Sequence, residues 1–159
     1  MWIGLLISAA AIAVGVIIGV HKAKNIRALQ KDGTIIRRDM NYAEKGEQFT
    51  SRIGSVPALR DEILKAKFPC DMKGDLAGAV DFTAKSFAAR LNLVAFDEPS
   101  GIAVYRFGFT RWKKDGYMYV DDISMNALMT AVEKTFLALD PNTGVQSYDV
   151  NFKTKHSIF

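Results

Sequence analysis

The sequence predicts an α+β protein in which a single N-terminal transmembrane helix precedes a small domain with an antiparallel four-stranded sheet packed by helices. Three observations predict this class: an uninterrupted apolar run at residues 2–20, apolar stripes at helical spacing, and later segments in which apolar and polar residues alternate. A chain of 159 residues has room for one domain behind one span. We expect a transmembrane helix over residues 1–20, a basic juxtamembrane helix and linker over 21–54, and a soluble domain over 55–159.

The apolar run at residues 2–20 has Ser8 as its only polar side chain and no charged one. At about 1.5 Å per residue, a helix of this length measures roughly 30 Å, which matches the hydrocarbon core of a bilayer. A cleavable signal peptide is the alternative, but it would begin with basic residues and have a shorter apolar segment. The run therefore favours an uncleaved signal-anchor in a single-pass membrane protein.

The positive charge of the chain lies directly behind this run. Residues 21–40 carry six basic and two acidic side chains, and this excess equals the net charge of +4 of the whole chain. The positive-inside rule then places the N-terminus outside and the domain in the cytoplasm. The remaining domain is neutral, which argues against nucleic-acid binding. We expect contact with anionic membrane lipids from four basic residues, Lys22, Lys24, Arg27 and Lys31.

Small residues recur every four positions on one face of the predicted span, at Ala11, Gly15 and Gly19. Such a stripe lets two helix backbones approach closely, so it predicts a homo-oligomer or a partner membrane protein. The alternative is that the stripe has no meaning, because Gly and Ala are common in membrane helices.

Three helices are expected before the first strand. Residues 21–31 continue the anchor and end at Asp32–Gly33, and residues 34–54 form a linker or edge element with a possible short strand at 34–38. A helix begins at Ser55 and stops at Phe68–Pro69. A further helix begins at Asp75 and is indicated by a stripe made of Leu76, Val80, Thr83, Phe87 and Leu91.

Period-two alternation then predicts a meander of three strands. The first covers residues 91–95 and ends in the turn at residues 99–101. The second covers residues 102–113 and directs Ala103, Tyr105, Phe107 and Phe109 to one face. A hairpin turn at Asp115–Gly116 leads into a third strand over residues 117–120.

The last two expected elements are a helix and a strand, which complete the order ααβββαβ. The helix begins at Ser124 and ends at Asp140–Pro141, and its polar face carries Asn126, Glu133 and Lys134. Its core stripe comprises Met125, Leu128, Met129, Val132, Phe136 and Leu139. The final strand alternates Tyr148, Val150 and Phe152 with polar residues.

Motifs of catalysis and cofactor binding are missing from the sequence. Two histidines and one cysteine cannot build the usual zinc site, and no nucleotide-binding or hydrolase motif occurs. Cys70 with His156 could form a nucleophilic pair, but a small incidental cysteine is the simpler interpretation. Asp121 and Asp122 suit the N-terminus of a helix better than a cation site. We expect a protein that is not an enzyme and has no cofactor.

The predicted hairpin carries the candidate interaction surface, because basic and aromatic residues gather there. They suit a lipid surface or a partner protein; the alternative is a solvated hairpin with its Trp packed on its own sheet. The surface comprises Arg111, Trp112, Lys113, Lys114 and Tyr117.

These features favour a non-enzymatic, membrane-anchored interaction protein, a subunit or adaptor of a membrane-associated assembly. The alternative is a membrane-tethered small-molecule or lipid-binding module, whose pocket would lie against Tyr105, Phe107 and Phe109.

Overall fold

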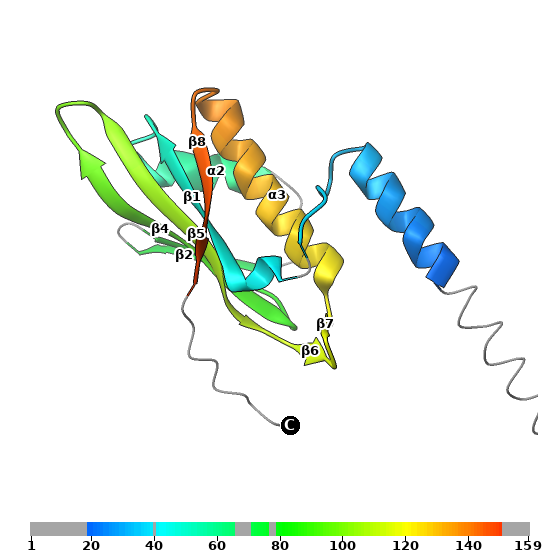
Figure 1. The fold of residues 1–159 in the computed structure, drawn as a ribbon. Helices are drawn as coiled ribbons and strands as arrows, with labels where there is room; N and C mark the ends of the chain where they lie inside the picture. Colours follow the sequence, from blue (N-terminus) through cyan, green and yellow to red (C-terminus); the bar gives the residue numbers. More distant parts are fainter. Residues whose placement is uncertain (1–18, 40, 66–70, 77–78, 151–159) are drawn as a thin grey trace, which may run out of the picture. The chain divides into compact units, whose positions relative to one another are not determined.

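The computed structural model describes residues 19–39, 41–65, 71–76 and 79–150 (Figure 1). The chain divides into two compact units, Met1–Arg37 and Arg38–Phe159. Of the expected span, residues 1–18 lie outside the described part. Among the described residues, no helix combines the length and the apolar character that a bilayer crossing requires.

The first unit contains a helix over residues 19–31, as the sequence predicts for 21–31. It ends where expected, because the Asp32 amide donates to the Ala28 carbonyl at 3.0 Å and Gly33 has a φ of 78°. This left-handed conformation suits glycine, which has no Cβ to clash.

The second unit is an α+β domain with a six-stranded antiparallel sheet in the order β2-β3-β4-β5-β1-β8 and a separate ribbon of β6 and β7 (Figure 1). Two helices and a short 3-10 helix complete the described elements. Along the chain these are η1 (Tyr42–Glu44), β1 (Lys45–Ser51), α2 (Val56–Lys65), β2 (Asp71–Leu76), β3 (Ala79–Thr83), β4 (Phe87–Asp97), β5 (Ile102–Trp112), β6 (Lys114–Asp115), β7 (Met118–Tyr119), α3 (Asp122–Leu139) and β8 (Gly144–Asp149).

The hydrophobic core lies between the sheet and the two helices, α2 and α3. The predicted inward face of β5 is confirmed, because Tyr105, Phe107 and Phe109 are at most 1% exposed. From α3, the Phe136 ring stacks on Phe49 of β1 with 4.2 Å between centroids. Ring stacking of this kind adds to the free energy gained by burying the two side chains.

The helix predicted from Asp75 to Leu91 is wrong, because this stretch contributes to three strands, β2, β3 and β4. In β3, Val80 and Phe82 face the core, and in β4, Phe87 and Leu91 do so. The inward residues of β3 and β4 alternate with a period of two, and the turn between these strands spaces them so that together they resemble the apolar stripe of one helix. Pairing of β4 with β3 and with β5 places these side chains on the buried face, and tertiary burial outweighs local helix propensity.

The linker predicted over residues 34–54 conceals a strand in the interior of the sheet. β1 pairs with β5 on one side and with β8 on the other, whereas residues 34–38 form no strand. Two of the inward positions of β1, Glu47 and Ser51, are polar. The sequence therefore does not show the alternation of apolar and polar residues by which a strand is recognised. Both polar side chains have partners elsewhere in the fold: Glu47 contacts Arg38, and Ser51 donates to the Asp140 carboxylate at 2.9 Å.

The remaining elements largely match the predictions. α2 and α3 are confirmed, although α3 begins at Asp122 and its predicted core residue Leu139 is exposed. The predicted third strand of the meander is wrong: residues 118–119 pair only with β6, and the described sheet has six strands rather than four. β5 ends at Trp112, although the next amide, that of Lys113, still donates to the carbonyl of Ser86, the residue before β4, at 2.9 Å.

Candidate functional site

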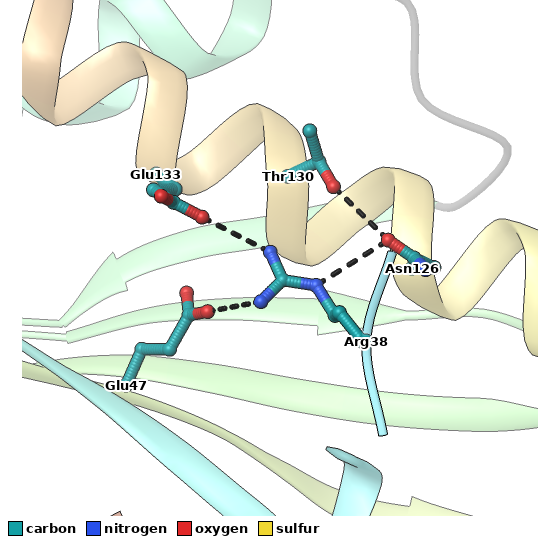
Figure 2. Close-up of polar contacts among 5 residues, drawn as sticks. All are labelled: Arg38, Glu47, Asn126, Thr130 and Glu133. Carbon is teal, nitrogen blue, oxygen red and sulfur yellow. Dashed lines mark hydrogen bonds and ion pairs between the residues drawn. The ribbon is translucent and has the colours of Figure 1, made fainter. Parts of the chain in front are cut away.

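A buried polar cluster forms where the chain enters the second unit (Figure 2). The Arg38 guanidinium donates to a carboxylate oxygen of Glu47 on β1 and, at 3.1 Å, to Glu133 on α3. Its Nε donates to Asn126 Oδ1 at 3.3 Å, and the Thr130 hydroxyl donates to the same oxygen at 3.0 Å. Asn126 and Glu133, which the sequence assigned to the polar face of a helix, are therefore in contact with Arg38.

Glu47 is the most unusual residue in this cluster because its carboxylate lies on the inward face of the sheet and is 4% exposed. Burial raises its pKa from an ordinary value of 4.5 to about 7; Arg38 opposes this rise and Glu133 adds to it. Within the described part of the chain, its Oε2 atom has no hydrogen-bond partner. One guanidinium faces two carboxylates, so uptake of one proton makes the cluster neutral.

The cluster fastens the start of the domain to its centre, because Arg38 is the first residue of the second unit and contacts both β1 and α3. Its charged groups are engaged with one another rather than directed at an open surface. Within the described part of the chain, no group of three or more His, Cys, Asp or Glu side chains is placed to hold a metal ion. The geometry indicates a structural role for this cluster, which joins the start of the domain to its centre. The cluster does not pair a nucleophile with a base.

The residues predicted to form an interaction surface are divided by the fold. Tyr117 is 95% exposed in the β6–β7 turn, and Lys113 and Arg111 are exposed beside it. Trp112 instead packs against the edge of the core, with its ring 6.4 Å from that of Tyr119. Lys114 pairs with Glu44 and lies 5.0 Å from the Tyr119 ring.

Two apolar residues that sequence reasoning missed also belong to this surface. Met118 is 53% exposed and Val120 is 57% exposed, on either side of the buried Tyr119. Met118 and Val120 point away from the core because they alternate with the inward Tyr119. The sequence pattern predicted that residues 117–120 form a strand of the sheet, and it did not indicate that these two side chains would be exposed. We use "β6–β7 tip" for the exposed residues of this ribbon and its flanks, Arg111, Lys113, Tyr117, Met118 and Val120.

The β6–β7 tip lies beside the segment through which the chain enters the domain. In this lead-in segment, residues 38–44 apart from residue 40, the Tyr42 ring lies 5.6 Å from that of Tyr119. The Tyr42 hydroxyl donates to the Asp122 carbonyl at 2.6 Å, and the Tyr119 hydroxyl donates to Glu44 at 3.4 Å. Burial raises the pKa of Tyr119 to about 12, so it remains a neutral donor at physiological pH. These contacts fix the tip to the lead-in segment.

The predicted lipid-contact residues in the first unit, Lys22, Lys24, Arg27 and Lys31, are all exposed on the helix over residues 19–31. In the predicted helix-contact stripe, Gly19 has open space where a Cβ would stand. Ala11 and Gly15 lie outside the described residues.

The other sequence candidates find no common site. Cys70 and His156 lie outside the described residues. Asp121 accepts a hydrogen bond from the Ser86 hydroxyl at 2.7 Å, and Asp122 lies in the first turn of α3. Asp122 thus occupies the position where a negative charge complements the helix dipole.

No protein-family model, curated protein or solved structure matches the chain.

Proposed function

We propose that this chain is a non-enzymatic, membrane-anchored interaction protein that acts as a subunit or adaptor of a membrane-associated assembly. Residues 2–20 are its single membrane span, with the N-terminus outside and the domain in the cytoplasm. The span contains no charged side chain, and the basic side chains that follow it are exposed along a helix.

These two features of the anchor carry the proposal, and the exposed apolar and basic side chains at the β6–β7 tip, beside the lead-in segment, add a surface on the domain itself. The formal charge of residues 41–159 is zero, and the polar cluster around Arg38 is engaged internally. Exposed apolar side chains beside basic ones are typical of a surface that meets a membrane or another protein.

A ligand-binding role has less support from the packing. The residues suggested to line a pocket contact other core side chains: Tyr105 lies 5.2 Å from Phe136, Phe107 lies 5.9 Å from Phe82, and Phe109 lies 5.8 Å from Phe87, between ring centroids. Because these rings already pack against other core rings, they are not available to line a ligand pocket.

The test is purification of the full chain in mild detergent, with mass analysis of what copurifies. We expect a homo-oligomer or a stoichiometric complex that depends on the small-residue stripe, so that Gly15→Leu with Gly19→Leu weakens it. The matched control is Ala13→Leu with Ile17→Leu, which changes neighbouring positions off the stripe. A chain that extracts as a partnerless monomer contradicts the proposal, as does one that does not float with vesicles.

A further inference from the structure

We propose that the β6–β7 tip docks on the anionic lipid surface of the membrane that holds the anchor, so that the domain is seated on the bilayer rather than hanging free. The inference rests on the proposed membrane anchoring and adds a second, peripheral contact. The occupant of this surface is lipid, not a protein partner.

The composition of the tip matches the interfacial region of a bilayer. Three of its side chains, Tyr117, Met118 and Val120, are more than half exposed within four residues. Tyr has an apolar ring with a polar hydroxyl and is favoured at the headgroup level, while Met and Val can enter the acyl boundary. Exposed apolar side chains that lie next to one another are typical of a surface that meets a membrane or a partner.

The charges around the tip complement an anionic surface. Residues 111–120 contain three basic side chains and one acidic one. Arg111, Lys113 and Lys114 are all exposed. Lys114 pairs with Glu44, and the Arg111 guanidinium also donates to the Ala84 carbonyl at 3.2 Å. Each basic side chain near an anionic membrane strengthens binding by about fivefold, and screening by salt reduces this effect.

The tip is also at the end of the domain that the chain reaches first from the anchor. Tyr42 and Glu44 of the lead-in segment contact Tyr119 and Lys114 directly. The loop between β4 and β5 lies at the opposite end of the same domain (Figure 1). The tip therefore adjoins the point at which the tether joins the domain, whereas the β4–β5 loop does not.

The chain length between anchor and domain permits this contact. Residues 21–31 as a helix extend about 16 Å beyond the span. Residues 32–37 begin with a turn, and even a fully extended chain of this length would add at most about 21 Å. A domain of this size has a radius of gyration of roughly 14 Å. Because the tether is at most about as long as the domain is wide, the effective concentration of the tip at the bilayer is high, and weak individual contacts are sufficient for docking.

The experiment uses the full chain reconstituted in vesicles, with Cys70→Ser to leave one introduced thiol. An environment-sensitive fluorophore is placed at Met118→Cys and, as the matched control, at Val94→Cys on β4, which is 49% exposed toward the other end of the domain. In phosphatidylglycerol-containing vesicles, we expect the label at 118 to shift to the blue and to be quenched by brominated lipid, and the label at 94 to do neither. Adding Arg111→Gln and Lys113→Gln should reduce docking about tenfold or more.

Three results overturn the inference. In the first, the chain floats with anionic vesicles while the label at 118 shows neither a blue shift nor quenching. This result contradicts the lipid contact of the tip and is consistent with the anchor. Equal quenching at 118 and 94 shows nonspecific adsorption. A chain that does not float at all removes the anchor and the docking together, and only this result contradicts the proposed function.

Discussion

At the level of single residues, Glu47 shows how one buried charge can be accommodated on the inward face of a sheet. Its nearest inward neighbour on β1 is Phe49, and a carboxylate there would be costly without Arg38. The raised pKa means that the folded state binds a proton more tightly than the unfolded state does. The free energy of unfolding therefore depends on pH through this residue.

Glu47→Gln should remove that dependence. Because the pKa is about 7 in the fold and 4.5 in an ordinary environment, its contribution is fully present below pH 4.5 and is lost as pH rises to about 7. The expected loss in the parent chain is about 3 kcal/mol. Urea unfolding at several pH values measures it, and the exposed Glu98→Gln should keep the full pH dependence. A parent chain whose unfolding free energy does not change over this range would contradict the raised pKa.

At the level of elements, the sheet is stabilised from its two sides by different means. On the inner side, α3 packs its apolar stripe on β1 and β5, with Phe136 against both Phe49 and Tyr105. On the other side, the Tyr148 ring of β8 lies over Gly46 of β1, and the Arg106 guanidinium lies 5.1 Å from that ring. Aromatic side chains thus contact both faces of the sheet around β1 and β5.

Phe136→Ala should destabilise the domain by about 3–5 kcal/mol, because it leaves a cavity between α3 and the sheet. The neighbouring Leu137 is exposed, so Leu137→Ala should cost far less. Chemical denaturation of both variants provides the comparison. Equal losses would show that the Phe136 ring is not a core contact.

Gly46→Ala should weaken the attachment of β8 to β1. A Cβ at this position would lie 2.3 Å from Tyr148 Cζ, so the ring must leave its place. We expect a loss of about 1–3 kcal/mol. At Gly108 the nearest atom to an added Cβ is 3.4 Å away, so Gly108→Ala is the tolerated control. If the ring is the cause, Gly46→Ala should cost little in a Tyr148→Ala background.

At the level of the whole molecule, the lead-in segment connects two units whose chemistry differs. The first carries the positive charge and the predicted anchor, and the second is a neutral α+β domain. Arg38 begins the second unit and is fixed to β1 and α3 by three side-chain partners. The domain therefore starts at a buried ion pair rather than at a loose linker.

Arg38→Leu should cost about 3–5 kcal/mol of unfolding free energy, because two carboxylates then face each other without a positive charge. The lead-in segment should also be cleaved earlier in limited proteolysis. Combining Arg38→Leu with Glu47→Gln should recover much of the loss, since one of the uncompensated charges is gone. Lys85→Leu, at an exposed lysine, is the control and should change neither measurement.

The sequence by itself determined the α+β class, the helices over residues 21–31, from Ser55 onward and over 124–139, and the strand with Tyr105, Phe107 and Phe109 inward. These elements have strong local periodicity and turn residues at their ends, so local information is sufficient for them. It also located the hairpin that carries Tyr117 and Lys113, but it left open whether Trp112 lies on the surface with them or packs on the sheet, and in the structure Trp112 packs against the core.

Only the tertiary structure decided the elements whose local pattern misleads. β1 is recognisable as a strand once Arg38 is seen to neutralise Glu47, because a polar residue at an inward position breaks the alternation. β3 and β4 replace the predicted helix because strand pairing on both sides buries Val80, Phe87 and Leu91. The exposure of Met118 and Val120 follows from the short β6–β7 ribbon, which leaves the sheet after Trp112. In each case contacts between separate elements decide the outcome, and the pattern of one segment alone does not record them.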